Sequence, residues 1–405
     1  MPPSPCPSRP DTRRILVLNW RDTGHPEAGG SEVYAESVAD GLAQRGHEVV
    51  LLTARHPGAH REDRRSSGVR VLRRGGRLTV YLQAALAHWT RRTGRPEFII
   101  ETQNGVPYLA ALWAPRTPHV VLVHHVHREQ WPVVFGPRAA RVGWWVESRL
   151  APWVNRRRPY IAVSEVTRTE LGEQGIDPAR VRVIHNGTIA PPAQDHARAA
   201  VPQLLVLGRL VPHKRVELAL QTLARLLPLV PEARLIIAGR GWWEDEIRAE
   251  VSRLGLEEHV ELAGFVSDEE RHRLYATSWV SLVPSLKEGW GLVVVEAGLH
   301  ATPTVAFEGT GGVTESIVHG RTGLLARPDD LDHFTAHVHA LIIDPDLRAA
   351  MGTAARQFAS GFTWTQTVDD VEDMMEGLVS DPRRPRRHTA GEPVRQAELE
   401  TTADA

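Results

Sequence analysis

The stretch from Leu204 to Lys214 reads LLVLGRLVPHK. Its apolar start predicts a buried strand, Gly208 predicts a turn, and Arg209 and Lys214 place two cations near the start of the next helix. A helix start offers unpaired N–H groups and the positive end of the helix dipole, so this unit is suited to bind a phosphate group. The alternative interpretation is a solvated basic helix start.

The same alternation of strand and helix patterns extends along the whole chain. Segments with helical spacing follow the apolar runs, as where Tyr34, Val38 and Leu42 lie at i, i+4 and i+8. Strands that are apolar on both faces and separated by helices indicate parallel, doubly wound α/β sheets. The predicted strands are residues 15–20, 48–53, 69–72, 98–101, 119–124, 160–163, 181–185, 204–207, 235–238, 260–262, 280–283, 304–307 and 324–326.

The chain has 405 residues, which suits two domains better than a single core. A polar, proline-bearing segment near residue 190 separates the two series of strands. We therefore predict two tandem Rossmann-like domains that face a central cleft. The predicted segments are a disordered leader (1–13), an N-terminal domain (14–190), a linker (191–202), a C-terminal domain (203–362), a helix that packs back on the N-terminal domain (363–379) and a disordered tail (380–405).

Composition excludes several classes of protein. The formal net charge is −1, which argues against a nucleic-acid partner, and the single cysteine, Cys6, excludes a disulfide framework and a cysteine-based metal site. We expect a cytoplasmic protein, because the start lacks the apolar core of a signal peptide and no run of about 18 apolar residues occurs. Only Lys214 and Lys287 among the 48 basic residues are lysine, which draws attention to their surroundings.

Lys287 belongs to a second informative stretch, PSLKEGWGLVVVE, which runs from Pro284 to Glu296. Glu288 lies on its glycine-rich turn, and Glu296 lies in the apolar run that follows. A buried carboxylate is costly without a partner, and an ionised carboxylate accepts hydrogen bonds from hydroxyl groups, so the pair suggests a sugar. The alternative is one capping and one salt-bridged glutamate. Combined with a phosphate-binding turn, the pair points to a nucleotide-sugar.

Two further motifs follow strands of the first half. A Gly-Gly-Ser sequence at residues 29–31 opens a helix, with Ser31 as the expected N-cap, although an ordinary capped loop is an alternative. His124, His125 and His127 follow a strand whose carboxyl end faces the cleft. We interpret them as substrate-handling residues and predict no metal, because no separate Cys/His/Asp cluster has ligand spacing.

Tryptophan and arginine concentrate in one region of the first half. Helices of this composition can lie at a membrane interface, line an acceptor cleft or simply pack. We favour packing or acceptor contact, because the sequence shows no sustained amphipathic basic face, and peripheral membrane contact is the less favoured alternative. Five of the twelve tryptophans are Trp113, Trp131, Trp144, Trp145 and Trp153.

From about Ile15 to Leu378 the chain resembles the family-4 retaining glycosyltransferases of the GT-B fold, also described as glycosyl transferase group 1. The most specific part of the resemblance is Glu288-x7-Glu296, and the sequences at residues 208–214 and 29–32 agree with it. One departure is Ala301, where the family usually has a glycine. Alanine suits that turn only if its φ is negative.

The resemblance implies which residues bind the donor, a nucleoside diphosphate sugar. Arg209 and Lys214 would neutralise the diphosphate, and Gly30 would approach it from the N-terminal domain. Glu296 would accept hydrogen bonds from the ribose hydroxyls, and the backbone of Val266 would meet the base. The residues that would hold the transferred sugar are Glu288, Gly289, Trp290 and Gly291, the last three through backbone amides.

The resemblance also implies roles in the N-terminal domain, which would bind the acceptor while the C-terminal domain binds the nucleotide-sugar. His124 would contact the donor sugar beside the anomeric carbon, with His125 as the alternative. Glu32 and His127 would lie near the acceptor.

The reaction implied by the resemblance is the retaining transfer of a hexose-type sugar from a UDP- or GDP-sugar to a hydroxyl acceptor in carbohydrate biosynthesis. No metal ion or other cofactor is expected, since two cations can serve in its place. A GT-B epimerase or hydrolase, or a non-catalytic subunit that binds a nucleotide-sugar, are the alternatives. The sequence leaves the base, the sugar, the acceptor (lipid, polysaccharide or small natural product) and the oligomeric state open.

Overall fold

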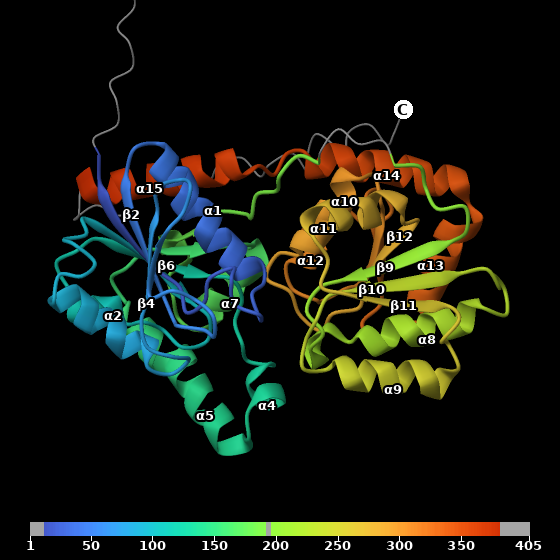
Figure 1. Cartoon of the computed structure of the whole chain (residues 1–405), viewed down its shortest axis with the longest axis horizontal. Helices are drawn as coiled ribbons and strands as arrows, with labels where there is room; N and C mark the ends of the chain where they lie inside the picture. Colours follow the sequence, from blue (N-terminus) through green and yellow to red (C-terminus); the bar gives the residue numbers. More distant parts are fainter. Residues whose placement is uncertain (1–11, 192–195, 381–405) are drawn as a thin grey trace, which may run out of the picture.

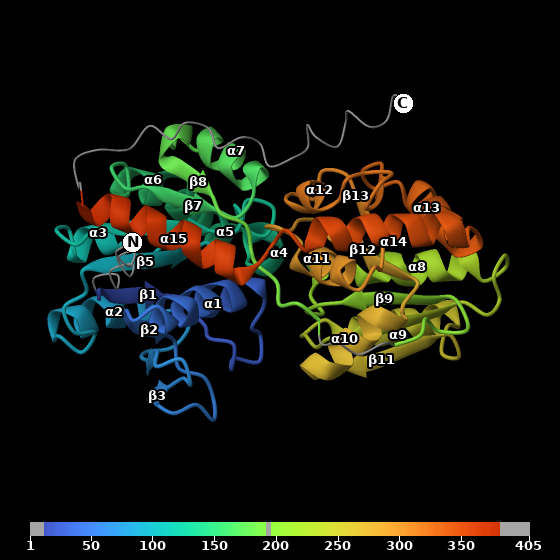
Figure 2. The same ribbon diagram turned by 90° about the horizontal axis from the view of Figure 1, so that it is seen from above.

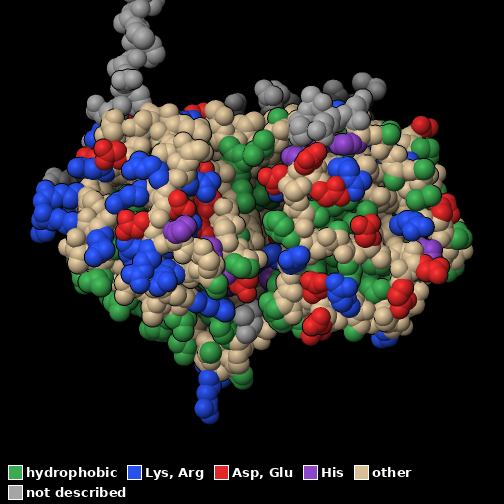
Figure 3. Space-filling model, in the orientation of Figure 1, with side chains coloured by type: hydrophobic (Ala, Val, Ile, Leu, Met, Phe, Trp, Pro, Cys, Tyr) green, Lys and Arg blue, Asp and Glu red, His purple; other side chains and the backbone are tan. Residues whose placement is uncertain are grey.

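The computed structural model describes residues 12–191 and 196–380, so most of the predicted leader and tail lie outside the described residues. Two α/β domains lie side by side, which confirms the predicted pair of Rossmann-like domains (Figures 1 and 2). A hollow separates them on the face shown in Figure 3. No helix among the described residues is long and apolar enough to cross a membrane.

The N-terminal domain is built on an eight-stranded sheet with the order β3-β4-β2-β1-β5-β6-β7-β8. Every strand pair in it is parallel except β3 with β4. The sequence analysis missed β3, a short exposed edge strand of sequence EDR that has no apolar pattern. The strands are β1 (Arg14–Leu18), β2 (Glu48–Thr53), β3 (Glu62–Arg64), β4 (Arg70–Arg73), β5 (Phe98–Gln103), β6 (His119–Val123), β7 (Tyr160–Ala162) and β8 (Val181–Val183).

Helices cover both faces of this sheet, because alternate strand residues are buried on each side. Ile15 and Val17 pack in one cluster with α1, whereas Leu16 and Leu18 pack in another with α2. The helices are α1 (Gly30–Gln44), α2 (Val80–Trp89), α3 (Ala110–Trp113), α4 (Trp131–Val134), α5 (Pro137–Trp145), the π-helix η1 (Val146–Leu150), α6 (Ala151–Val154), α7 (Glu165–Glu173) and the 3₁₀ turn η2 (Pro178–Arg180).

The C-terminal domain has an all-parallel six-stranded sheet with the order β11-β10-β9-β12-β13-β14. Its strands are β9 (Gln203–Leu207), β10 (Arg234–Ala238), β11 (Val260–Gly264), β12 (Val280–Val283), β13 (Thr304–Phe307) and β14 (Gly323–Ala326). Its helices are η3 (Pro212–Lys214, 3₁₀), α8 (Val216–Leu226), α9 (Glu244–Leu254), α10 (Asp268–Thr277), α11 (Leu292–Leu299), α12 (Val313–Ser316), α13 (Leu331–Ile343) and α14 (Pro345–Ala359).

The last described helix, α15 (Trp364–Ser380), leaves the C-terminal domain and lies against α1 of the N-terminal domain (Figure 2). Val368 and Met375 belong to the same buried cluster as the residues of α1. Polar contacts reinforce the packing, since Glu372 pairs with Arg45 and its carboxylate lies 2.8 Å from Nε2 of His47. The helix therefore joins the two domains through a second connection besides the linker.

Ala301 adopts a φ of +54°, so the expectation of a negative φ is wrong. A left-handed conformation costs an L-residue roughly 1–2 kcal/mol, and its surroundings hold this one in place. Nη2 of Arg198 donates to the Ala301 carbonyl at 2.5 Å, and a side chain at Gly352 would collide with the same carbonyl.

We predict that Ala301→Gly raises the free energy of unfolding by about 1 kcal/mol, because it removes the strain at little cost in chain entropy. Ala350→Gly, at an exposed position inside α14, should lower it by about 1 kcal/mol. Chemical denaturation measures the free energy of unfolding of both variants, which should rise for Ala301→Gly and fall for Ala350→Gly. Equal effects of the two changes would contradict the strain at Ala301.

The α1–α15 contact depends on Gly41, where a Cβ would lie 2.5 Å from Cγ2 of Val368. Gly41→Ala should therefore lower the free energy of unfolding by about 1–3 kcal/mol through overpacking. Gly377→Ala in α15, where a Cβ meets nothing within 4 Å, should be neutral or stabilising. Thermal and urea unfolding measure the stability of both variants. If Gly41→Ala leaves the free energy of unfolding unchanged, α15 does not pack closely against α1 at this position.

Candidate functional site

The carboxyl ends of β9 and β12 form a small pocket at the side of the C-terminal domain that faces the cleft. It encloses about 10 Å³, room for about one water molecule. The residues that line it are Val206, Leu207, Gly208, Arg209, Lys214, Val216, Leu282, Val283, Pro284, Ser285, Glu288 and Val293. The structure therefore brings together the two stretches singled out in the sequence.

Lys214 and Glu288 form an ion pair inside this pocket. Oγ of Ser285 donates to Oε1 of Glu288 at 2.7 Å, and the Leu286 amide donates to the carbonyl of His213 at 2.8 Å, which ties the two loops together. Burial alone would raise the pKa of Glu288, but the charge of Lys214 and the hydrogen bonds outweigh it and lower that pKa. Glu288 is thus an ionised acceptor next to a cation.

Glu296 lies on α11, beyond the pocket. Oη of Tyr275 donates to its Oε2 at 2.9 Å, and Tyr275 packs in a cluster that also contacts Val266. Burial raises the pKa of Glu296, and the charge of Arg271 only partly offsets this. Glu296 and Val266, which the resemblance assigns to the ribose and the base, therefore both lie next to the cluster that contains Tyr275. Their contacts with a ligand stay predictions.

On the other side of the cleft, α1 begins at Gly30 with Gly29 as its N-cap, so the expected cap at Ser31 is wrong. The reason is Glu32, whose fully buried carboxylate accepts from the Gly29 amide at 2.7 Å and from Ser31 Oγ at 2.9 Å. Nε of Arg21 is a third donor to it, at 3.3 Å. Glu32 therefore shapes the loop, and its contact with an acceptor stays a prediction.

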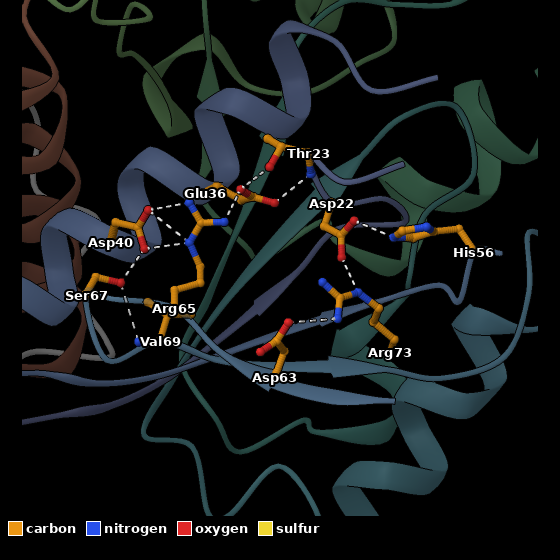
Figure 4. Close-up of polar contacts among 10 residues, drawn as sticks. All are labelled: Asp22, Thr23, Glu36, Asp40, His56, Asp63, Arg65, Ser67, Val69 and Arg73. Atoms are coloured by element: carbon orange, nitrogen blue, oxygen red, sulfur yellow. Dashed lines mark hydrogen bonds and ion pairs between the residues drawn. The ribbon is translucent and has the colours of Figure 1, made fainter. Parts of the chain in front are cut away.

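The loop that precedes α1 is held by a polar network that also includes the β3–β4 edge (Figure 4). Asp22 accepts from Nε of Arg73 at 2.5 Å and lies 3.0 Å from Nε2 of His56. The amide and hydroxyl of Thr23 both donate to Glu36 at 2.7 Å. The strand β3 that the sequence analysis missed thus borders the segment that anchors this loop.

The N-termini of α1 and α11 approach each other across the cleft. A methyl group at Gly30 would lie 4.0 Å from Cδ2 of Leu292, the first residue of α11. Arg209 lies beside them, with its Nη1 donating to the carbonyl of Glu27 at 3.4 Å and its Nε 3.2 Å from where a methyl group at Gly29 would be. Two positive helix ends and two cations therefore converge on one space, which suits a diphosphate.

The three histidines after β6 take different positions. The ring of His124 packs edge-on against Tyr34 with centroids 5.3 Å apart, and burial, then the charge of His127, lower its pKa to about 3. Nε2 of His124 is buried without a hydrogen-bond partner among the described residues. His125 lies 3.0 Å from Oε1 of Gln130, and burial also lowers its pKa.

His127 is oriented by Glu147, which the sequence analysis did not single out. Oε1 of Glu147 accepts from the His127 amide and lies 3.0 Å from its Nδ1, while Oε2 of Glu147 accepts from Nε1 of Trp131 at 2.6 Å. Burial, Lys214, Arg209 and then His127 lower the pKa of His213 to about 4. His127 is thus close enough to the C-terminal domain to affect its charges.

Charged contacts between the domains were also missed, because they depend on how the domains are placed. Nζ of Lys287 lies 2.6 Å from Glu170 and 3.0 Å from Glu129, both of the N-terminal domain. Glu315 accepts from the amides of Glu165 and Val166, at 2.9 and 2.7 Å, and so caps α7 across the interface. Lys287 therefore joins the two domains next to the glycine-rich turn that contains Glu288.

The glycine-rich turn itself also contacts the N-terminal domain. A Cβ at Gly289 would collide with the carbonyl of His124. The side chain of Trp290 stacks on His185, with ring centroids 4.1 Å apart, and is buried in the N-terminal core. The side chain of Trp290 therefore points into the N-terminal core, and the ligand contacts of the backbone amides of this turn stay a prediction.

A second cavity, of about 320 Å³, lies on the outer side of the loop before α1. The guanidinium of Arg21 lies 4.0 Å from the centroid of the Trp20 ring, and that of Arg77 lies 5.8 Å from it. Glu27 lines this cavity and contacts Arg209, so a single loop separates the cavity from the pocket of Lys214 and Glu288. The residues that line it are Trp20, His25, Pro26, Glu27, Ala54, Arg55, His56, Pro57 and Arg77.

Comparison with known proteins identifies the family. Residues 193–358 match the family described as Glycosyl transferases group 1, and residues 28–189 match Glycosyltransferase Family 4. The chain belongs to the family-4, group 1 glycosyltransferases.

Curated relatives agree with this assignment. The chain is 36% identical over 216 residues to D-inositol 3-phosphate glycosyltransferase of Kribbella flavida, a match that spans 48% of this chain and half of that protein. It is 27% identical to a GDP-mannose-dependent alpha-(1-6)-phosphatidylinositol monomannoside mannosyltransferase of Mycolicibacterium smegmatis, over 87% of this chain and 96% of that protein.

Solved structures share the fold. Sucrose-phosphate synthase from Thermosynechococcus elongatus superposes with a TM-score of 0.78 at 19% identity, over 91% of this chain and 99% of that one. Anabaena HepE in complex with UDP and glucose superposes with a TM-score of 0.70 at 20% identity, over 90% of this chain and 100% of that one.

We predict that Lys214→Ala and Glu288→Ala each lower glycosyl transfer at least tenfold while the fold survives, because each removes a charged group that the resemblance assigns to the donor. Initial rates and thermal unfolding measure the two effects. Arg253→Ala, which removes a cation from an exposed ion pair of the same domain, is the matched control and should be silent. Wild-type turnover in either pocket variant would contradict the site.

Proposed function

We propose that this protein transfers a hexose-type sugar from a UDP- or GDP-sugar to a hydroxyl acceptor, with retention of configuration and without a metal ion. The observation that carries the proposal is the convergence of Arg209, Lys214 and the N-termini of α1 and α11 beside the ionised Glu288. This arrangement offers cations to a diphosphate and a hydrogen-bond acceptor to sugar hydroxyls within one pocket.

Donor binding would exchange the partners of the resting ion pair. Nζ of Lys214 would move from Glu288 to the diphosphate, and the freed carboxylate would accept from hydroxyls of the sugar. The exchange would proceed with the two domains opened, because the turn at Gly289 packs against the carbonyl of His124 and Lys287 pairs with Glu129 and Glu170 across the cleft. Reclosure would then exclude water and limit hydrolysis of the donor.

In the reaction, the acceptor oxygen bonds to the anomeric carbon while the bond from that carbon to the diphosphate breaks. The bonding electron pair leaves with the phosphate oxygen, which takes the proton of the acceptor hydroxyl. Negative charge grows on the diphosphate in the transition state, where Arg209, Lys214 and the helix ends act most strongly. The carbonyl of His124, which packs against Gly289, and the ring of His127 are the nearby groups on the other side of the cleft.

The comparisons support this class of donor and of acceptor. Relatives are described as D-inositol 3-phosphate glycosyltransferase and as GDP-mannose-dependent mannosyltransferases, and HepE has been solved with UDP and with UDP-glucose. We place the acceptor in the cavity beside Trp20, because its loop borders the donor pocket. An aromatic wall and hydrogen-bonding side chains suit a polar, cyclic acceptor.

A donor screen tests the proposal. The protein is incubated with a panel of nucleoside diphosphate sugars in the presence of EDTA, and thermal shift and free nucleotide are measured. We expect one donor to stabilise the fold with slow nucleotide release, and the anomeric configuration of the product, read by NMR, to match that of the donor.

Other outcomes would contradict the proposal. Fast turnover of the donor without an acceptor would favour an epimerase or hydrolase, and binding without turnover under any acceptor would favour a non-catalytic subunit. Loss of activity in EDTA that returns with Mg²⁺ would overturn metal independence. Arg209→Ala should weaken donor binding, whereas Arg253→Ala should leave it unchanged.

A further inference from the structure

One face of the N-terminal domain exposes an unusual amount of apolar surface. Ten of the fifteen large hydrophobic side chains that are exposed among the described residues lie between residues 78 and 153. Isolated exposed side chains are ordinary, but a concentration on one face marks an interaction site. The ten residues are Leu78, Leu82, Leu86, Trp89, Leu112, Val133, Phe135, Val142, Trp145 and Trp153.

Helix α2 carries the clearest part of this face. Leu82, Leu86 and Trp89 follow each other at helical spacing and are 69%, 47% and 63% exposed, and Leu78 just before the helix is 81% exposed. The opposite side of α2 is buried through Val80, Ala84 and Ala87. A helix that only covers a core carries polar residues outside, whereas this helix is apolar on both sides.

All of these exposed residues except Val133 and Phe135, which lie in or next to α4, come from helices on the same face of the sheet or, in the case of Leu78, from just before α2. Leu16 packs under α2 and α3, and Val121 and Tyr160 pack under Trp144 of α5. All three strand residues point to the same side of the sheet, so these helices cover one face. Direct contacts join the helices, since Nε1 of Trp89 donates to the carbonyl of Trp113 at 3.2 Å. Figure 1 shows α2 and α5 on one side of the sheet and α15 on the other.

This face is also strongly basic. Residues 77–158 contain twelve arginines, no lysine, no aspartate and four glutamates, in a chain whose net charge is −1. Two of those glutamates, Glu101 and Glu147, are buried, and the other two, Glu97 and Glu129, pair with Arg14 and Lys287.

Several arginines of this face are exposed and can therefore interact with an anionic partner. Among the described residues, the exposed arginines of this face that form no ion pair with a carboxylate include Arg91, Arg92, Arg138, Arg141 and Arg149. Figure 3 shows hydrophobic and basic side chains along the lower edge of this domain.

We infer that this face, formed by α2, α3, α5 and α6 and here called the docking face, binds peripherally to a membrane that carries anionic lipids. Leucine and tryptophan side chains suit the boundary between headgroups and acyl chains, and each arginine near an anionic surface adds about 1 kcal/mol. The inference goes beyond the proposed function and does not depend on it.

A membrane explains the combination better than two other occupants. A second copy of the chain would bring the same arginine-rich face against itself in a two-fold dimer, and like charges would repel. A nucleic acid would suit the arginines, but it offers no apolar phase for Leu78, Leu82 and Leu86. No single helix shows the whole pattern, which is why the sequence favours packing over membrane contact.

The docking face adjoins the cavity beside Trp20. Arg77 lies three residues before α2 and lines that cavity. Its guanidinium is 5.6 Å from the ring centroid of Phe135, the exposed residue that follows α4. Docking would therefore bring the mouth of the acceptor cavity near the headgroups. An acceptor whose hydroxyls sit on a lipid could then reach the cleft without leaving the membrane.

The test is flotation of the full chain with vesicles of phosphatidylcholine alone and of phosphatidylcholine with phosphatidylglycerol at about three to one. We expect binding to the mixed vesicles that weakens with salt, and little binding to the neutral ones. The double variant Leu82→Glu with Leu86→Glu should lower the partition coefficient at least tenfold. The matched control, Leu229→Glu with Ile343→Glu, changes two exposed apolar residues of the C-terminal domain and should bind as wild type.

Circular dichroism and thermal unfolding, recorded for every variant, show whether the fold survives. An unchanged fold with lost vesicle binding supports the docking face even if no donor binding or transfer is ever observed. Failure of the wild type to float with the mixed vesicles, or equal losses in both double variants, would overturn the inference. So would a dimer in light scattering that the α2 variant abolishes, or tight binding of duplex DNA that competes with the vesicles.

Discussion

The ion pair between Lys214 and Glu288 is the contact on which the cleft depends. Both groups lie in a pocket with room for about one water, and a charge buried there without a partner would cost several kcal/mol. The pair also fixes the loops that follow β9 and β12, and it thereby sets the turn at Gly289 against the carbonyl of His124. A nucleotide-sugar brings both replacement partners at once, namely a diphosphate for the lysine and hydroxyls for the glutamate. Neither charge would be left unpaired during the proposed exchange, so the resting ion pair would not prevent donor binding.

Opening as proposed would have to break two kinds of contact between the domains. Lys287 forms ion pairs with Glu129 and Glu170, and Trp290 is buried in one cluster with the core of the N-terminal domain. The two connections between the domains run side by side, because the amide of Thr188 donates to the carbonyl of Phe362 at 3.0 Å. Beyond this crossing α15 is anchored on α1. Opening as proposed would therefore be centred on this crossing, and the ion pairs of Lys287 with Glu129 and Glu170 would report whether the cleft is closed.

The sequence predicts this architecture where one local pattern decides the structure, and it fails where distant groups decide. Thirteen apolar runs predict strands, and each lies at a strand of the structure, because burial on both faces leaves a clear pattern. Strand β3 is exposed and depends on pairing with β4, so its residues carry no such pattern. Ser31 loses the cap to Gly29 because a buried glutamate three residues later takes over the amide, and Ala301 is held left-handed by Arg198. The phosphate and sugar stretches were predicted together, but Glu147 and Glu315 act through partners that only the folded chain brings close.

The docking face and the moving parts lie on opposite sides of the N-terminal sheet. Helices α1 and α15 cover the side that includes Ile15, and α2, α3, α5 and α6 cover the side that includes Leu16. A membrane bound to the second side would leave α15 and the crossing at Thr188 uncovered. The N-terminal domain could then stay on the lipid with its acceptor cavity at the surface, while the C-terminal domain opens to exchange nucleotide. A docking face on the other side would cover the crossing at Thr188, where the two connections between the domains meet, so the placement of the exposed leucines is compatible with turnover at a membrane.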